Sequence, residues 1–197
     1  CRINGYASDI TRTSIKMNID PLFKDLLCGV ECVEQELVNL VKPNVRYADL
    51  HSGALVKIGT LLLELSICFG SLENLLKNEI PQLFMPHGIG HLLGIQVHDV
   101  GGHLKDINGN IESPPVHSPF LRNTRVMAEN MVFTIEPGCY FIPSLLETQR
   151  NTEKDKLINW KAIEQLYPYG GIRIEDNILV TAGGRENLTR QFEEINP

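Results

Sequence analysis

The chain has 197 residues, of which 43% are hydrophobic and 21% charged, the profile of a globular protein with one domain, residues 1–197. The formal net charge of −6 comes without a Lys/Arg cluster, which argues against a nucleic-acid partner. No apolar stretch approaches the roughly 18–20 residues that cross a bilayer, and the first residues lack an apolar signal core. We therefore expect no membrane partner and a cytoplasmic location.

Cysteine is present five times, an odd number, at widely scattered positions. Three of the five lie inside apolar helical patterns, so we expect buried thiols in a reducing compartment and neither a disulfide framework nor a CxxC metal site. Cys28 and Cys32 are four residues apart and share one helix face, which ordinary packing explains. The five positions are Cys1, Cys28, Cys32, Cys68 and Cys139.

Helical patterns dominate the first part of the chain. Asp20 followed by Pro21 is typical of a helix start, because Asp caps free backbone N–H groups and Pro suits the first helical position. Apolar residues at helical spacing then continue to about Lys42, and a second such pattern follows. The expected elements are a short strand at residues 6–10 and helices at residues 21–42, 48–68 and 72–78.

From Pro81 onward, glycines, histidines and short β-type runs replace the helical periodicity. A long insertion, residues 143–170, separates two of these runs and contains a short helix over Trp160–Leu166. Helices first and strands afterwards predict an α+β fold with helices covering one face of a sheet. The expected strands are residues 97–100, 131–135 and 172–175.

Three of the six histidines fall within twelve positions, at His87, His91 and His98. The glycines between them would each weaken a helix by about 1 kcal/mol relative to Ala, so we expect loop and strand there. No Glu follows His87, which excludes a zincin motif. A lone histidine is usually structural, but three converging on one Gly-rich segment favour a site. For the remaining three we expect structural roles: His51, His103 and His117.

Three carboxylates stand in unusual places. Glu136 ends a strand just before Pro137, Glu175 lies between apolar strand residues, and Asp9 follows a short strand. A carboxylate on a half-buried strand either faces solvent or is neutralised inside. Together with one histidine, three carboxylates on separate strands are the ligands that hard divalent ions such as Mn²⁺ prefer.

Five motifs occur in the order seen in the prolidase and aminopeptidase P group, and together they cover essentially the whole chain. The resemblance implies the pita-bread fold, a curved antiparallel sheet covered by helices. The long insertion before Glu175 is similar to that of bacterial Xaa-Pro dipeptidases (prolidases) and the related organophosphorus acid anhydrolases, whereas aminopeptidase P lacks most of it. The motifs are Gly5 to Thr13, His87 to His91, Val97 to Gly101, Thr134 to Gly138 and Gly171 to Asn177.

The resemblance implies two divalent metal ions, Mn²⁺ by preference. Asp9 and Glu175 match the bridging ligands, and His91 and Glu136 match two ligands of one metal. A fifth ligand of the family, an Asp about eleven residues before Asp9, would fall ahead of Cys1. We therefore expect an N-terminally truncated fragment that lacks the family's N-terminal domain and is inactive alone, from a full-length homodimer.

The implied activity is hydrolysis of Xaa-Pro dipeptides by a hydroxide held between the metals. Glu136 takes the proton of the water and later passes it to the proline nitrogen. His87 and His98 line the pocket and donate hydrogen bonds to substrate and oxyanion. Arg122 matches the arginine that reads the free carboxylate of a dipeptide. Arg173 either binds substrate or neutralises the carboxylates, and we favour neutralisation.

Two other functions stay open. The same site in an organophosphorus acid anhydrolase hydrolyses phosphotriesters, and no motif in the chain separates the two activities. A pita-bread binding module without metals is the second alternative. Such modules usually lose several ligands at once, whereas this chain keeps four.

Overall fold

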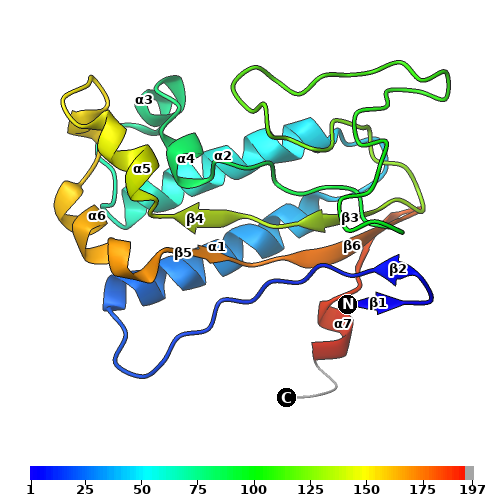
Figure 1. Cartoon of the computed structure of the whole chain (residues 1–197), viewed down its shortest axis with the longest axis horizontal. Helices are drawn as coiled ribbons and strands as arrows, with labels where there is room; N and C mark the ends of the chain where they lie inside the picture. Colours follow the sequence, from blue (N-terminus) through cyan, green and yellow to red (C-terminus); the bar gives the residue numbers. More distant parts are fainter. Residues whose placement is uncertain (194–197) are drawn as a thin grey trace.

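The computed structural model of the chain describes residues 1–193, and Figure 1 shows two long helices packed behind a sheet. The helices are α1 (Pro21–Leu40), α2 (Tyr47–Glu64), α3 (Leu72–Lys77), α4 (Ile80–Phe84), α5 (Pro143–Leu146), α6 (Trp160–Leu166) and α7 (Arg190–Glu193), with short 3-10 turns at Glu147–Gln149, Asp155–Leu157 and Tyr167–Tyr169. The strands are β1 (Arg2–Ile3), β2 (Tyr6–Ala7), β3 (Val132–Ile135), β4 (Gly138–Tyr140), β5 (Gly171–Arg173), β6 (Asp176–Thr181) and β7 (Gly184–Asn187).

Helix α1 begins where the sequence predicts. The Asp20 carboxylate accepts a hydrogen bond from the backbone N–H of Leu22 at 2.8 Å, and Pro21 occupies the first helical position. The helix ends at Leu40, two residues before the predicted end, because Val41 is already extended. Its buried face consists of apolar residues at helical spacing, among them Phe23, Leu26, Val30, Val33 and Leu37.

Helix α2 covers residues 47–64 and is shorter than the predicted 48–68. Ser66 adopts a left-handed conformation with φ of 54°, and the N–H groups of Ile67 and Cys68 both donate to the carbonyl of Leu62. This pattern satisfies carbonyls at the helix end and stops the helix before Cys68. Helices α3 and α6 lie where the sequence predicts, whereas α4 was not predicted.

The sheet is a long antiparallel ladder interrupted in its middle. Strand β3 pairs with β6, and β4, which continues the line of β3, pairs with β5. The interruption falls at Glu136 and Pro137 on one side and at Ile174 and Glu175 on the other. Two of the predicted ligands therefore lie opposite each other where regular strand pairing stops.

The helices cover one face of this sheet, as predicted. Figure 1 shows α1 and α2 behind the strands, and α1 contacts β3, β5 and β7. Apolar side chains from both layers form one core, and burying each large one contributes about 1.5–3 kcal/mol. Members of this core with no exposed surface include Leu26, Leu37, Ile58, Leu62, Phe133, Ile135, Ile172 and Ile178.

The predicted strand at residues 97–100 is wrong. This segment is a loop that folds back, because the N–H of Asp99 donates to the carbonyl of Leu92 at 3.0 Å. Val97 and Val100 are exposed, so their spacing reflects no buried face. The strand predicted at residues 6–10 is reduced to β2, two residues long.

The prediction of buried thiols holds for two cysteines. Cys68 and Cys139 are buried, but Cys1, Cys28 and Cys32 are exposed. Cys28 and Cys32 do share one face of α1, yet it is the solvent face, because the opposite face carries the residues that contact the sheet.

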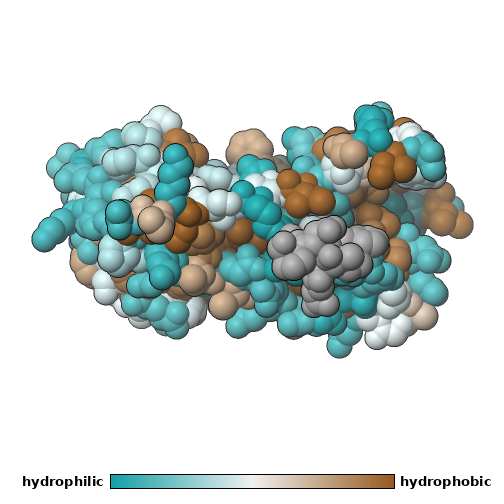
Figure 2. All heavy atoms as spheres, turned by 90° about the horizontal axis from the view of Figure 1, so that it is seen from below, coloured by the Kyte–Doolittle hydropathy of each residue, from teal (hydrophilic) through white to brown (hydrophobic). Residues whose placement is uncertain are grey.

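The surface mixes polar and apolar residues. Figure 2 shows the face seen from below Figure 1, where hydrophilic residues predominate and hydrophobic patches lie between them. Exposed apolar side chains include Ile3 and Tyr6 of the β1–β2 hairpin. Among residues 1–193, no helix combines the length and the apolar character that crossing a membrane requires.

Candidate metal centre

Four predicted ligands, Asp9, His91, Glu136 and Glu175, converge although they are far apart in the sequence, and we call them the carboxylate–histidine centre. Nε2 of His91 lies 3.5 Å from Oδ2 of Asp9 and 3.5 Å from Oε1 of Glu136. One ligand atom each of His91, Glu136 and Glu175 lies within 4.8 Å of the others. The structure thus brings together the side chains that the sequence singled out.

The four side chains come from four neighbouring extended segments. Thr11, two residues after Asp9, pairs with Glu175 in an antiparallel bridge. Next to it, β6 pairs with β3, whose end leads into Glu136. On the far side of β3, the carbonyl of His91 accepts a hydrogen bond from the N–H of Thr134 at 3.0 Å. Each ligand therefore has a backbone partner on a neighbouring segment.

Gly90 explains why the histidine segment is extended. A Cβ atom at this position would overlap the Thr134 carbonyl and the hydroxyl of Tyr47. Tyr47 is fully buried and its hydroxyl donates to the same carbonyl at 2.6 Å. Only glycine permits so close an approach of the two backbones, and that approach places His91 beside β3. The prediction of loop and strand in this segment is confirmed.

The hydrogen bonding of His91 tests whether the centre fits a cation. Its Nδ1 lies 2.9 Å from the carbonyl oxygen of Leu92, which can only accept, so Nδ1 carries the hydrogen. The Nε2 lone pair of the neutral ring then faces the oxygens of Asp9 and Glu136. In addition, the buried Oε1 of Glu175 has no hydrogen-bond partner. Acceptor atoms that converge in this way require a cation, and one nitrogen with several carboxylate oxygens fits a divalent metal.

The electrostatics of the centre agree with this fit. Burial, followed by the charge of Glu175, raises the pKa of Glu136 to about 7, and burial also raises the pKa of Glu175. Two hydroxyls offset part of this cost, as the sequence predicted. Thr11 donates to Oε2 of Glu175 at 2.5 Å, and Thr134 donates to Oε1 of Glu136 at 3.3 Å. A bound cation would stabilise the charged carboxylates much further.

Arg173 contacts the carboxylates directly. Its Nη1 atom lies 3.3 Å from Oε2 of Glu136, and its Nε atom donates to the hydroxyl of Tyr140 at 2.8 Å. These contacts favour neutralisation of the centre over substrate binding, which is the preference derived from the sequence. Tyr140 was not among the predicted residues. Its position in β4, directly after the Glu136 motif, was the available signal.

His87 uses both ring nitrogens within the protein. Nδ1 donates to the carbonyl of Gly88 at 2.7 Å, so Nε2 of the neutral ring accepts from the Tyr140 hydroxyl at 2.8 Å. A chain of contacts therefore runs from His87 through Tyr140 and Arg173 to Glu136. This arrangement holds the ring at the wall of the site but leaves it no free donor for a substrate.

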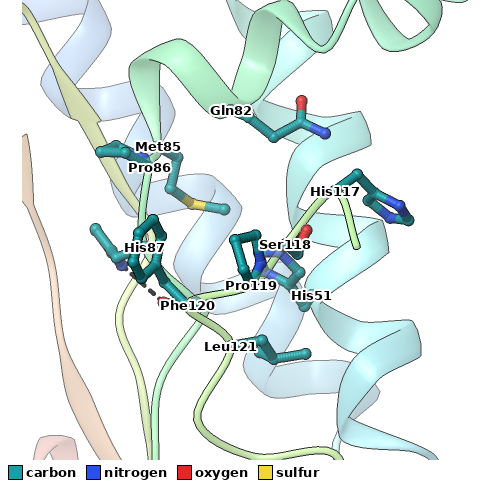
Figure 3. Close-up of a pocket in the computed structure, with 11 residues that line it drawn as sticks. His51, Gln82, Met85, Pro86, His87, His117, Ser118, Pro119, Phe120 and Leu121 are labelled. Atoms are coloured by element: carbon teal, nitrogen blue, oxygen red, sulfur yellow. Dashed lines mark hydrogen bonds between the residues drawn. The ribbon is translucent and has the colours of Figure 1, made fainter. Parts of the chain in front are cut away.

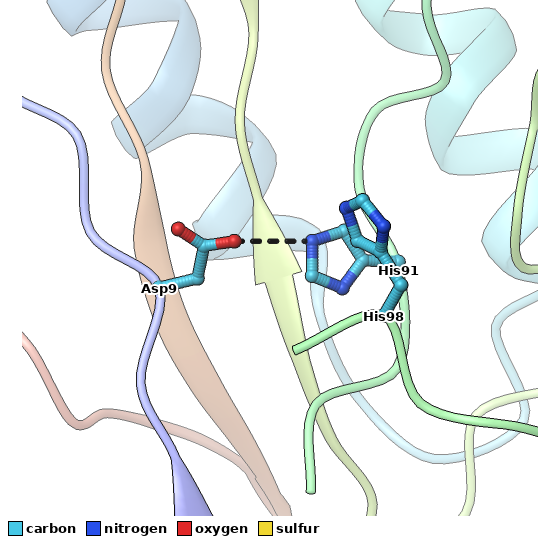
Figure 4. Close-up of side chains that lie close together, drawn as sticks. All are labelled: Asp9, His91 and His98. Atoms are coloured by element: carbon cyan, nitrogen blue, oxygen red, sulfur yellow. Dashed lines mark ion pairs between the residues drawn. The ribbon is translucent and has the colours of Figure 1, made fainter. Parts of the chain in front are cut away.

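His98 lies on the rim of the centre. Its ring packs nearly perpendicular to that of His91, at an interplanar angle of 78° and a centroid distance of 4.3 Å. One ligand atom each of Asp9, His91 and His98 lies within 4.8 Å of the others, as Figure 4 illustrates. The side chain is exposed, so a molecule entering from solvent meets His98 before His91.

A cavity of about 190 Å³ opens beside the centre. His91 and Glu136 form one part of its wall, and Arg122 and Phe120, from a separate loop, form another. Arg122 also lines a wider hollow of about 540 Å³ next to His98. All the predicted substrate-binding residues, Arg122, His98 and Arg173, therefore border the cavity.

Residues 1–182 match the model of metallopeptidase family M24. The chain belongs to this family. Membership agrees with the α+β architecture, and the fold is the pita-bread fold expected from the sequence. The centre is thus the part of an M24 domain in which a metal would be held.

Relatives in the M24 family include Xaa-Pro dipeptidases of bacteria. The chain is 47% identical to that of Pseudoalteromonas atlantica over 191 residues, which is 96% of the chain and 43% of the relative. It is 46% identical to that of Aeromonas hydrophila over 189 residues, which is 96% of the chain and 42% of the relative. The chain therefore spans less than half the length of these relatives.

Solved structures of the same fold include aminopeptidases P. Aminopeptidase PepP of Pseudomonas aeruginosa is 29% identical with a TM-score of 0.70, over 96% of this chain and 36% of that one. Zn-substituted Escherichia coli aminopeptidase P in complex with product is 26% identical with a TM-score of 0.68, over 95% and 36%. The identity to the dipeptidases is clearly higher, which agrees with the long insertion at residues 143–170.

Proposed function

We propose that the protein carrying this chain hydrolyses Xaa-Pro dipeptides with the help of two divalent metal ions, Mn²⁺ by preference. The observation that carries the proposal is the convergence of His91 Nε2 on the carboxylates of Asp9 and Glu136, beside a cavity bordered by Arg122. The names of the bacterial relatives support the substrate class. A cytoplasmic homodimer is part of the same proposal and rests on the resemblance alone.

In this proposal, Asp9 and Glu175 each bind both metals, and His91 and Glu136 bind one of them. When bound, the ions lower the pKa of a water molecule and polarise the peptide carbonyl. Thr11 and Thr134 hold the carboxylates of Glu175 and Glu136 in fixed orientations, which pre-organises the ligands.

Glu136 has the second role of proton carrier. It takes a proton from the attacking water and delivers it to the proline nitrogen, because a tertiary amide nitrogen must be protonated to leave. Its contact with Arg173 at 3.3 Å holds one carboxylate oxygen and leaves the other beside His91. The same residue therefore orients the attacking group and assists the leaving group.

The histidines differ in what they can contribute. His98 is exposed and makes no hydrogen bond within residues 1–193, so it can donate to the substrate or to the oxyanion. His87 is engaged with Gly88 and Tyr140, and we assign it the indirect task of fixing Tyr140 and Arg173 at the wall.

Arg122 accounts for the preference for a dipeptide. The free carboxylate of proline lies one residue from the scissile bond, and a guanidinium binds a carboxylate through two parallel hydrogen bonds. Within the described residues this guanidinium has no acidic partner, so it is available for a ligand.

The experiment compares Arg122→Ala with the parent, both as full-length protein loaded with Mn²⁺, on Leu-Pro and on Leu-Pro-amide. Loss of the charged contact is worth on the order of 2–4 kcal/mol, a drop of roughly 30- to 1000-fold in kcat/KM for Leu-Pro. The amide never makes that contact and should be cleaved as before. An equal loss on both substrates would contradict the assignment of Arg122. Faster turnover of a fluorophosphate than of any Xaa-Pro dipeptide would favour the phosphotriesterase alternative.

A further inference from the structure

Arg122 combines an exposed side chain with a firmly held backbone. The next two residues, Asn123 and Thr124, are each 1% exposed, and Leu121 before it is also 1% exposed. The guanidinium itself makes no hydrogen bond or ion pair within the part of the chain that the structure describes. A free charged group on a fixed backbone is the arrangement that a binding residue needs, because little order remains to be imposed when the ligand arrives.

One anchor of this backbone comes from helix α2. His51 is 2% exposed, and its Nε2 lies 2.9 Å from the hydroxyl of Ser118, which is itself buried. Figure 3 shows the two side chains next to each other at the wall of a cavity of about 150 Å³, with His87 also on that wall. Ser118 starts the turn that leads to Arg122, because its carbonyl accepts from the N–H of Leu121 at 3.1 Å.

A second anchor comes from the loop on the other side. The Nε2–H of His103 donates to the carbonyl of Leu121 at 2.9 Å. The neighbouring Gly102 accepts a hydrogen bond from the N–H of Thr124 at 2.9 Å, and a Cβ atom there would overlap the carbonyl of Arg122. The turn before Arg122 is thus tied to the rest of the domain by two histidines from different elements.

We propose that His51 and His103 are positioning residues that fix the turn at residues 118–122 and thereby hold the Arg122 guanidinium where a substrate carboxylate meets it. This inference rests on the proposed function, because it assumes that Arg122 reads a carboxylate. Neither histidine borders the 190 Å³ cavity beside the centre, so both act through Arg122.

The test uses full-length, Mn²⁺-loaded protein carrying His51→Ala, His103→Ala or both. His51→Gln and His103→Gln are the conservative variants, because the glutamine amide can replace the Nε2 hydrogen bond. His117→Ala is the matched control, since His117 is an exposed histidine in the same loop. Kinetics on Leu-Pro and Leu-Pro-amide are measured for each variant, together with Mn²⁺ affinity.

Each alanine variant should lose about tenfold in kcat/KM on Leu-Pro, mainly through a higher KM, because one buried hydrogen bond no longer holds the turn. Cleavage of Leu-Pro-amide and Mn²⁺ affinity should stay within about twofold of the parent, since neither depends on Arg122. The glutamine variants should recover most of the loss, and His117→Ala should behave as the parent.

Limited trypsin digestion gives a readout that needs no substrate. Arg122 is a trypsin site, and cleavage there requires local opening of the turn. In the alanine variants the cut after Arg122, identified by mass spectrometry, should appear at least about fivefold faster than in the parent. The cut after Arg150, in a different segment, should keep its rate.

The two levels of the proposal fail differently. Equal losses on both substrates in Arg122→Ala would remove the carboxylate contact and, with it, any reason to position Arg122. A selective loss in Arg122→Ala together with parental kinetics and trypsin cleavage in the histidine variants would leave the function standing and overturn the anchoring alone. Unselective losses in the histidine variants would likewise overturn it, because they would indicate a general weakening of the fold.

Discussion

Nε2 of His91 lies 3.5 Å from Oε1 of Glu136, and both atoms are acceptors when the histidine is neutral. Two acceptors stay this close in a buried site only if a proton or a metal ion lies between them. The contact follows from the pairing of the His91 segment with β3, which fixes both side chains on the same side of the sheet.

The first prediction concerns these two residues. His91→Ala should weaken Mn²⁺ or Co²⁺ binding by more than the roughly 10- to 100-fold typical of outer-sphere changes, because it removes a ligand. Titration calorimetry, or the visible absorption of bound Co²⁺, measures the affinity. His117→Ala is the control, since this histidine is exposed and outside the centre. Unchanged affinity in His91→Ala would remove it from the ligand set.

Thr11 provides the second prediction. Its hydroxyl donates to Glu175 at 2.5 Å and orients this carboxylate. Thr11→Val keeps the shape but removes the donor, so metal affinity should fall about 10- to 100-fold. Thr11→Ser retains the hydroxyl and should restore most of the affinity. If the valine variant binds metal as tightly as the parent, the hydroxyl does not orient the ligand.

The third prediction separates Tyr140 from the metal ligands. Its hydroxyl links Arg173 to His87 through two contacts of 2.8 Å. Tyr140→Phe should lower kcat on Leu-Pro about tenfold or more, because Arg173 loses a partner and Glu136 its fixed orientation. Metal affinity should change far less than in His91→Ala. A parallel loss of metal binding would place Tyr140 in support of the ligands instead.

Gly90 gives a prediction about stability. The side chain of Gly90→Ala would overlap the Thr134 carbonyl and the Tyr47 hydroxyl, so the free energy of unfolding should fall by at least about 1–3 kcal/mol. Gly183→Ala is the matched control, because a Cβ atom there meets nothing within 4 Å, and its change should stay within about 0.5 kcal/mol. Urea unfolding of both variants decides the matter, and equal stabilities would contradict the close approach.

His51 predicts how stability depends on pH. Burial lowers its pKa from 6.5 to about 4. Because the pKa in the folded chain lies below that in the unfolded chain, the unfolded chain binds more protons across this window, and stability falls as the pH drops from about 6.5 to 4. The contribution is on the order of 3 kcal/mol. Urea unfolding at pH 7 and pH 4.5 should show a steeper loss for the parent than for His51→Gln, and parallel losses would argue against a buried neutral histidine.

Local sequence determined much of the architecture. The start of α1 follows from Asp20 and Pro21, because capping and the restricted φ of proline act within one turn. The ordered motifs and the spacing of the histidines and carboxylates pointed to the centre, since ligand chemistry depends on residue type. Short-range signals failed at residues 97–100, where the apolar alternation lies on a solvent-exposed loop.

Only the tertiary structure decided which side chains meet. The convergence of Asp9, His91 and Glu136 depends on strand pairing between distant segments, which no local pattern encodes. The same holds for Tyr140 and for His51, because a tyrosine hydroxyl or a buried imidazole acquires its task from the partner that packing places beside it. Sequence therefore set the chemistry available to this domain, and the pairing of its strands and loops set where that chemistry is assembled.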